Sequence, residues 1–210
     1  MAIYLFDLWG TLVEQGTWSP IKQARSILNV RIKYSDFVSR MQKILMIKKF
    51  ESLADAFTEL CEEFSVKPTK ETVEQLVGMW NKYWMLAKPY KEVEKVLKKL
   101  KKEGNDLVLV VNTDSFSAPN LIKKHKFFEM FDQMFFSYKM GIVKTNPLFL
   151  EQVLKKLNKD PKDLILVGDS LKSDISPGLR LGIKSILVDR KNSRDYELKI
   201  ENLAELEKIL

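Results

Sequence analysis

The residues best suited to chemistry lie just after short apolar segments of the sequence. Asp7 ends the first such segment, and Asp169 directly follows a later one. A carboxylate can attack phosphorus as a nucleophile, and its oxygens suit a hard cation such as magnesium. The residues at the ends of the apolar segments are Asp7, Trp9 and Thr11, then Asn112, Thr113 and Asp114, and then Asp169, Ser170 and Asp174. Lys144 lies in a loop between them and could neutralise an anion as a point charge.

Each of these residues also has a plain structural interpretation. The carboxylates of Asp7, Asp169 and Asp174 could cap helices or turns. Thr11 could supply a hydroxyl to a local turn, and a single lysine such as Lys144 is usually a surface residue. A site is therefore predicted only if the fold brings these residues together.

An alternation of strand and helix patterns predicts such a fold. Short apolar segments with β-branched residues indicate strands that are buried on both faces. These strands are expected over residues 2–8, 107–111, 134–137, 164–167 and 185–188. Amphipathic helices between them imply right-handed crossovers and a Rossmann-like, doubly wound parallel sheet, which is an α/β fold. Ligands bind beyond the carboxyl ends of such strands, where the candidate residues lie.

Residues 15–87 interrupt this alternation with helical periodicity alone. We therefore expect an α/β core formed by residues 1–14 and 88–210, with an all-helical domain inserted after the first strand. Three aromatic residues near the end of the insertion are spaced for one face of a helix. These are Trp80, Tyr83 and Trp84. We favour their packing inside the helical domain over contact with a substrate.

Four features, in this order, resemble the haloacid dehalogenase superfamily, most of whose members are phosphatases. They are DLWGT at residues 7–11, the helical insertion, Lys144 in VKTNP, and GDSLKSD at residues 168–174. The resemblance covers essentially the whole chain. It implies a Mg²⁺-dependent hydrolase of a small phosphorylated compound, which acts through an aspartyl-phosphate on Asp7.

The resemblance also assigns roles to the other residues. Mg²⁺, which bridges the nucleophile and the phosphate, is expected to bind Asp7, the Trp9 main-chain carbonyl, Asp169 and Asp174. Lys144 is expected to neutralise the nucleophile and the transferring group, which makes it catalytic together with Asp7. The phosphate is expected to bind Thr11, Asn112, Thr113 and Lys144.

Two positions depart from the pattern of these phosphatases. Most carry a second Asp two residues after the nucleophile, which protonates the leaving group, and this chain has Trp9 there. An alcohol leaves poorly without a proton, so the acid comes from elsewhere or the leaving group is a better one. The superfamily also usually places Ser or Thr before Asn112, where this chain has Val111. Thr113 could substitute only if the end of the strand shifted by one residue.

Two other functions stay open. The dehalogenases of the superfamily typically carry a non-acidic aromatic residue at the position of Trp9, and halide leaves without an acid or a metal. A 2-haloacid dehalogenase with Asp7 as nucleophile is therefore an alternative. Those enzymes use neutral residues where this chain has Asp169 and Asp174, whose mutual repulsion is costly without a cation, and this favours phosphoryl chemistry. The third hypothesis is a binding module of the same fold without turnover.

The insertion lies where the superfamily places a mobile helical cap, with hinges expected near residues 14–16 and 88–89. Residues 15–49 hold eight Lys and Arg residues against one acidic residue. We expect this charge to help attract an anionic substrate, so neutralising Arg25 and Arg40 should raise KM at low salt.

Composition limits the other partners. The 210 residues carry 35 Lys and Arg against 28 Asp and Glu, a net charge of +7. These charges are spread over many helices, so no nucleic-acid partner is expected. Cys61 is the single cysteine, no secretion signal precedes the first strand, and no apolar run approaches the roughly 20 residues of a membrane span. These features predict a cytoplasmic protein without a membrane partner. The Lys- and Glu-rich composition is typical of a thermophile, and the sequence predicts no oligomeric state.

Overall fold

The computed structural model describes residues 2–14 and 19–209. Within these residues, six parallel strands form one sheet in the order β3-β2-β1-β4-β5-β6. The strands are β1 (Ile3–Phe6), β2 (Asp106–Val111), β3 (Gln133–Phe136), β4 (Leu164–Gly168), β5 (Lys184–Val188) and β6 (Lys199–Ile200). The predicted α/β fold and its first five strands are confirmed. Strand β6 was not predicted, because only two of its residues pair with β5 and no apolar run marks it.

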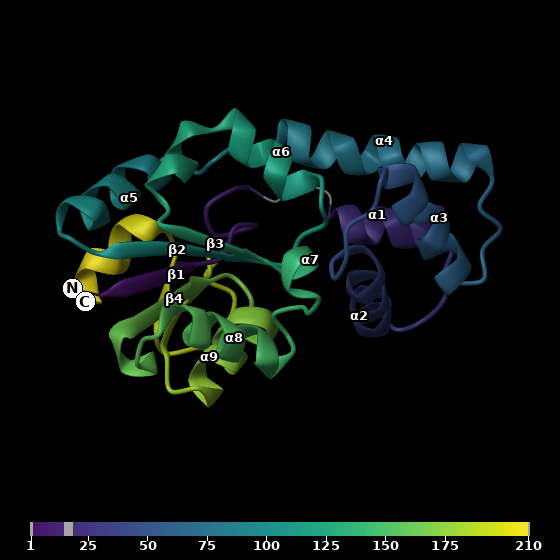
Figure 1. Ribbon diagram of the computed structural model, residues 1–210. Helices are drawn as coiled ribbons and strands as arrows, with labels where there is room; N and C mark the ends of the chain where they lie inside the picture. The colour runs from purple at the N-terminus through teal and green to yellow at the C-terminus, as the bar shows by residue number, and fades with distance from the viewer. Residues whose placement is uncertain (1, 15–18, 210) are drawn as a thin grey trace.

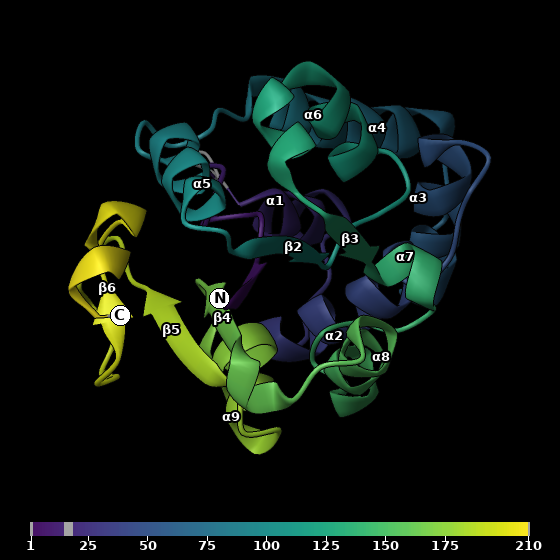
Figure 2. The same cartoon turned by 60° about the vertical axis from the view of Figure 1, so that its left-hand side comes forward.

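Helices cover both faces of this sheet (Figures 1 and 2). Helices α5 (Val93–Lys102) and α6 (Ser117–Lys124) lie on one face, and α8 (Pro147–Leu157) and α9 (Ser176–Arg180) lie on the other. Alternate residues of β1 point to opposite faces. Tyr4 and Phe6 pack in the cluster that contains α5 and α6, whereas Ile3 and Leu5 pack with α8. Burial on both faces explains why the strands are continuous apolar runs rather than alternating patterns.

The chain between β1 and α5 forms the helical segment, which we define as helices α1 to α4. The helices are α1 (Pro20–Ile27), α2 (Tyr34–Leu45), α3 (Leu53–Glu63) and α4 (Lys70–Leu86). Ser52 begins α3 with a reciprocal capping box to Asp55. The helices bury an apolar cluster of their own, in which Phe57 and Trp80 meet edge to face with ring centroids 5.6 Å apart. No helix in the parts of the chain described above is long and apolar enough to cross a bilayer.

The helical segment lies beyond the carboxyl ends of the strands (Figure 1). The strand order reverses at β1, which pairs with β2 on one side and with β4 on the other. Such a switch point opens a crevice between the two connections, and ligands bind there in open parallel sheets. The segments that follow β1 and β4 are therefore the ones that can build a site.

Candidate active site

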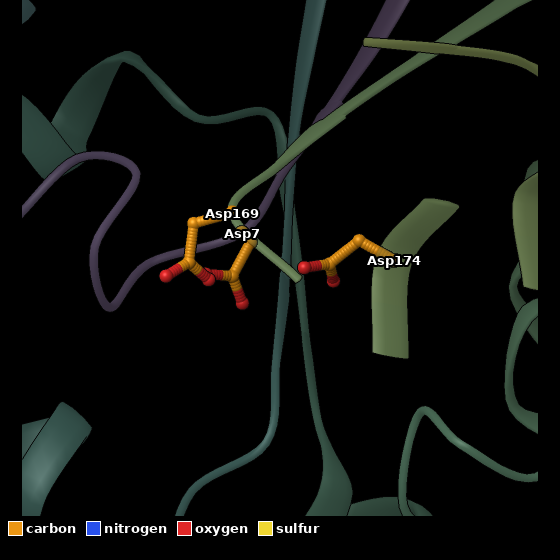
Figure 3. A group of neighbouring side chains, drawn as sticks. All are labelled: Asp7, Asp169 and Asp174. Carbon is orange, nitrogen blue, oxygen red and sulfur yellow. The ribbon is translucent and has the colours of Figure 1, made fainter. Parts of the chain in front are cut away.

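Three aspartates meet at the switch point of the sheet (Figure 3). Asp7 follows β1, and its backbone N–H donates to the Val167 carbonyl of β4 at 2.9 Å. Asp169 follows β4, and Asp174 lies in the π-helical turn Leu171–Ile175. Among the described residues, these three aspartates form a group whose carboxylate oxygens lie within 4.8 Å of one another. The structure thus brings together the three carboxylates to which the resemblance assigned a metal, whereas Asp114 lies outside this group.

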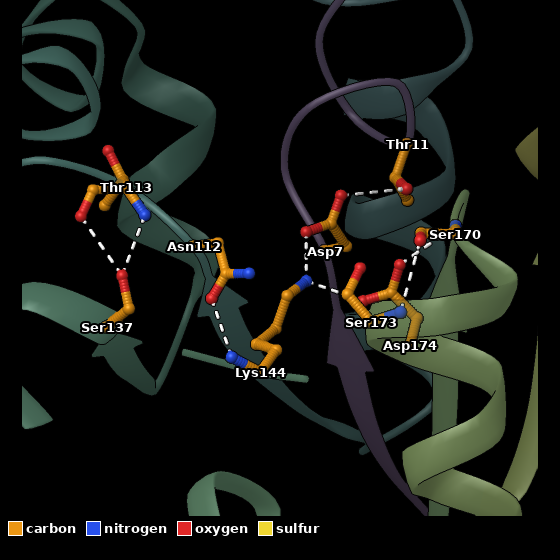
Figure 4. A network of polar contacts seen from close by, with 9 residues as sticks. All are labelled: Asp7, Thr11, Asn112, Thr113, Ser137, Lys144, Ser170, Ser173 and Asp174. Atoms are coloured by element: carbon orange, nitrogen blue, oxygen red, sulfur yellow. Dashed lines mark hydrogen bonds and ion pairs between the residues drawn. The ribbon is translucent and has the colours of Figure 1, made fainter. Parts of the chain in front are cut away.

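Lys144 is the cation of this group (Figure 4). Its side chain is 2% exposed, and Nζ donates to Asp7 Oδ1 and, at 2.6 Å, to Asp174 Oδ1. Asn112, just after β2, fixes the loop that carries the lysine, because its Oδ1 accepts from the Lys144 backbone N–H at 2.7 Å. Lys144 is therefore a buried structural partner of two carboxylates and not a surface residue.

The remaining bonds orient the two buried carboxylates. The Thr11 hydroxyl donates to Asp7 Oδ2 at 3.3 Å, so Thr11 acts on Asp7 directly. The Ser170 backbone N–H donates to Asp174 Oδ2 at 3.0 Å. With Lys144 on the other oxygen of each, Asp7 and Asp174 each accept bonds at both oxygens. Little rotational freedom is left to either carboxylate.

The electrostatics of the group favour an additional positive charge. Burial, together with the charge of Asp174, raises the pKa of Asp7 to about 6 and outweighs the lowering by Lys144. Burial also raises the pKa of Asp169 well above its usual range, helped by Asp7 and Asp174. Burial alone would lower the pKa of Lys144, but the two carboxylates it contacts outweigh this and raise it. Three carboxylates against one ammonium, with oxygen donors only, therefore fit a divalent cation such as Mg²⁺.

The hydroxyl expected near the phosphate is absent from this group. Strand β2 ends at Val111, so the one-residue shift that would bring in Thr113 does not occur. The Thr113 hydroxyl instead donates to the Asp114 carbonyl at 3.2 Å and accepts from the Ala118 backbone N–H at 3.4 Å, away from Asp7 (Figure 4). Thr113 nevertheless lines the same cavity as Asp7 and Lys144, so its expected contact with a phosphate stays a prediction. Asn112 is the residue at the end of β2 that contacts Lys144, through its Oδ1.

A cavity of about 500 Å³ opens above the carboxylates, between the sheet and the helical segment. Trp9 and Tyr83 form one wall, with ring centroids 4.8 Å apart. Trp80 also lines the cavity, and its Nε1 donates to Asp114 Oδ2 at 2.9 Å. The expectation that these helical aromatic residues pack only inside the helical domain is wrong for Tyr83, which faces the site. Trp80 packs inside the helical segment against Phe57 and also lines the cavity, so the expectation holds for it only in part.

The described lysines and arginines in the first half of the helical segment do not line this cavity. Arg25 donates to the backbone carbonyls of Val30 and Ile32 at the end of its own helix. Arg40 pairs with Glu63 at 2.6 Å. These arginines stabilise the helical segment, so the expected rise in KM on neutralising them loses its physical basis. The cations that line the cavity in the described chain come from the sheet side, and they are Lys144, Lys172 and Arg194.

Several residues of the site were not predicted from the sequence. Arg194 reaches back from the loop after β5, and its guanidinium donates to the Asp169 carbonyl. Arg190, in the same loop, donates to the carbonyls of Gly10 and Thr11 and so fixes the turn after Asp7. Ser117 lines the cavity with a buried hydroxyl that has no hydrogen-bond partner among the residues the structure describes. The contacts of the two arginines join segments far apart in the sequence, and no local spacing marks any of these three residues.

The glycine before Asp169 is required by the close approach of Asp174. A Cβ at Gly168 would lie 2.4 Å from Asp174 Cγ. Gly168→Ala should therefore displace this carboxylate from Lys144, lower the free energy of unfolding by about 1–3 kcal/mol and reduce any activity of the site. Urea unfolding measures the first effect. The control is Gly78→Ala in α4, where no atom lies within 4 Å and the change should stabilise by about 0.5–1 kcal/mol. Equal effects of both substitutions would contradict the role assigned to Gly168.

The fold and the site define a class: an α/β enzyme with a carboxylate-rich active site at the switch point of a parallel sheet. A family model described as haloacid dehalogenase-like hydrolase matches residues 1–182. The chain belongs to this family.

The proteins that resemble this chain in sequence or fold include both phosphatases and a dehalogenase. The chain is 23% identical to the glyceraldehyde 3-phosphate phosphatase of Pyrococcus furiosus over 209 residues, which cover 97% of this chain and 87% of that protein. It superposes on a HAD phosphatase from Thermococcus onnurineus with a TM-score of 0.67 and 20% identity, covering 100% and 97% of the two chains. A 2-haloacid dehalogenase from Pseudomonas syringae gives a TM-score of 0.67 with 16% identity and the same coverage. The fold alone therefore does not separate the two reactions.

Proposed function

We propose that this protein is a Mg²⁺-dependent phosphatase that acts on a small phosphorylated compound through an aspartyl-phosphate on Asp7. The observation that carries the proposal is the group of Asp7, Lys144, Asp169 and Asp174, in which one oxygen of each carboxylate lies within 4.8 Å of the others. A haloacid dehalogenase would have no use for the two additional carboxylates, whose charges repel each other unless a cation is bound. The name of the full-length Pyrococcus furiosus relative supports the same reaction class.

In the first step, Asp7 attacks phosphorus, an oxygen–phosphorus bond forms, and the bond to the leaving oxygen breaks. Lys144 stabilises the charge on the nucleophile and on the transferring group, and Thr11 keeps the carboxylate oriented. Asn112 offers its amide nitrogen to a phosphate oxygen. In the second step, water hydrolyses the aspartyl-phosphate and restores Asp7.

The residues that would hold Mg²⁺ are Asp7, Asp169 and Asp174, together with the main-chain carbonyl of Trp9. Bound there, the cation would supply charge neutralisation between the carboxylate and the phosphate, which otherwise repel each other. Arg194 supports this edge of the site, because it holds the Asp169 carbonyl from the neighbouring loop.

The helical segment fits the role of a cap over this site, with the domain division proposed as 1–14 and 88–210 against 15–87. Its side chains Gln42, Met46 and Tyr83 line the cavity opposite Lys144. The two connections to the sheet run side by side, since the Glu14 N–H donates to the Lys88 carbonyl at 2.9 Å. The hinge expected near residues 14–16 lies mostly outside the described residues, and the one near 88–89 is at this crossing.

Phosphate release from 4-nitrophenyl phosphate tests the function, because this activated ester makes the least demand on a leaving-group acid. We expect turnover with Mg²⁺, at least about a hundredfold loss in EDTA, and recovery when Mg²⁺ is added back. Turnover that EDTA leaves unchanged would contradict the metal role. No release from any phosphate ester, with ligand binding retained, would favour the binding-module alternative.

One observation keeps the dehalogenase as a second candidate, namely the aromatic wall that Trp9 forms two residues after the nucleophile. Halide leaves without protonation, so this site would need no acid there. Chloride release from a short 2-haloacid in EDTA would support that reaction and overturn the phosphatase proposal.

A further inference from the structure

The cavity contains few groups that could protonate a leaving group. Among its described lining residues the carboxylates are Asp7, Asp114 and Asp169, and there is no His, Glu or Cys. Under the proposed function, Asp7 attacks phosphorus and Asp169 holds the cation. General acid catalysis would have to come from a group that is still free.

Asp114 is not such a group. Its Oδ1 accepts from the backbone N–H groups of Phe116 and Ser117, both at 2.8 Å. Its Oδ2 accepts from Trp80 Nε1 at 2.9 Å. A carboxyl group that is 3% exposed and accepts three hydrogen bonds at its two oxygens is occupied in fixing the start of α6 to Trp80.

The basic residues of the cavity do not fill the role either. Lys144 is held between Asp7 and Asp174, and the guanidinium of Arg194 donates to the Asp169 carbonyl. Lys172 is exposed at the rim of the cavity. The hydroxyl of Tyr83 is the remaining aromatic O–H in the described wall of the cavity, and Tyr83→Phe removes it without removing the ring.

The position where an acid would be useful is instead apolar. Trp9, two residues after Asp7, packs against Tyr83 with ring centroids 4.8 Å apart. Trp80 lies next to Tyr83, with centroids 6.5 Å apart, and Met46 completes this side of the cavity. Such rings bind another aromatic ring by stacking or edge contacts.

We infer that the substrates are aryl phosphates, whose leaving group is a phenol that departs without an enzymic proton and whose ring lies against Trp9 and Tyr83. This inference rests on the proposed function. The Asp7 oxygen forms the bond to phosphorus, and the bond between phosphorus and the phenolic oxygen breaks. The phenoxide leaves with the electron pair and takes its proton from water. Hydrolysis of the aspartyl-phosphate then releases inorganic phosphate.

Phenyl phosphate and benzyl phosphate form a matched pair for the test. Both carry one aromatic ring, but phenol is a far stronger acid than benzyl alcohol. The wild-type enzyme with Mg²⁺ should show a kcat/KM for phenyl phosphate at least about a hundredfold above that for benzyl phosphate, which is the range a general acid supplies. Ratios within about threefold would overturn the inference. If the enzyme hydrolyses neither these esters nor 4-nitrophenyl phosphate, the proposed phosphatase function itself fails. If it hydrolyses 4-nitrophenyl phosphate but does not distinguish phenyl from benzyl phosphate, only the inference about aryl phosphates fails.

Three variants locate the effect. Trp9→Asp places a carboxyl group after the nucleophile and should raise kcat for benzyl phosphate at least about tenfold. Tyr83→Leu should raise KM for phenyl phosphate about tenfold, and Tyr83→Phe, which keeps the ring, should restore most of that loss. A large fall of kcat in Tyr83→Phe would identify the hydroxyl as the proton donor and overturn the inference. Circular dichroism and thermal unfolding establish that each variant is folded.

Discussion

Asp7→Asn should abolish phosphate release, with kcat lower by roughly 10⁴-fold or more, as expected when a nucleophile is removed from a group that acts as a unit. The amide has the shape of the carboxylate but cannot form the aspartyl-phosphate. Single-turnover assays with 4-nitrophenyl phosphate and Mg²⁺ measure the effect. Acid quenching should trap a phosphorylated protein in the wild type and none in the variant.

The same substitution should leave the fold intact or make it more stable when no metal is bound. The pKa of Asp7 is raised to about 6, above the value of 3.8 for a free carboxyl, so its ionisation at neutral pH lowers the free energy of unfolding. An amide avoids this cost, and Lys144 keeps its bond to Asp174. Thermal unfolding in EDTA should therefore give a Tm equal to or above that of the wild type. Turnover retained in Asp7→Asn would exclude Asp7 as nucleophile.

The parts of the structure that local patterns determine were predicted well. A strand buried on both faces needs a continuous apolar run, and β2 supplies one from Leu107 to Val111 with every residue buried. The switch point follows from strand order, and residues that end strands β1 and β4 must then meet. The prediction that Asp7 and Asp169 share one site therefore depended on the order of the strands more than on the type of either residue.

Long-range contacts were beyond the sequence patterns. Helical spacing placed Trp80 and Tyr83 on neighbouring positions of one face, but it did not decide whether that face packs inward or lines a cavity. Arg40 illustrates the same limit. Its charge suggested that it attracts an anionic substrate, but Glu63, 23 residues away, neutralises that charge. The position of Arg194 against Asp169 likewise required the path of the loop after β5.

Lys144→Met should be the most damaging substitution for stability and the second most damaging for activity. It keeps the length of the side chain but removes the ammonium that bonds Asp7 and Asp174. Loss of the charge from the transferring group should lower kcat by about 10²–10³-fold. Removing one partner of a buried ion pair should lower the free energy of unfolding by about 3–5 kcal/mol in EDTA. Urea unfolding and phosphate release measure the two effects.

The pH dependence of this loss separates electrostatics from packing. Burial already raises the pKa of Asp7 and of Asp169 above their unfolded values, and removal of Lys144, which lowers both, should raise them further, so the folded state binds more protons than the unfolded state. The free energy of unfolding of Lys144→Met should therefore fall as pH rises from about 4 through 6 and beyond, and much of the loss should disappear near pH 4. Lys155→Met, at an exposed lysine of α8, is the matched control and should change stability by no more than about 0.5 kcal/mol at any of these pH values. A loss in Lys144→Met that is the same at pH 4 and pH 8 would mean that Lys144 contributes packing alone, and the charge balance on which the metal assignment depends would have to be abandoned.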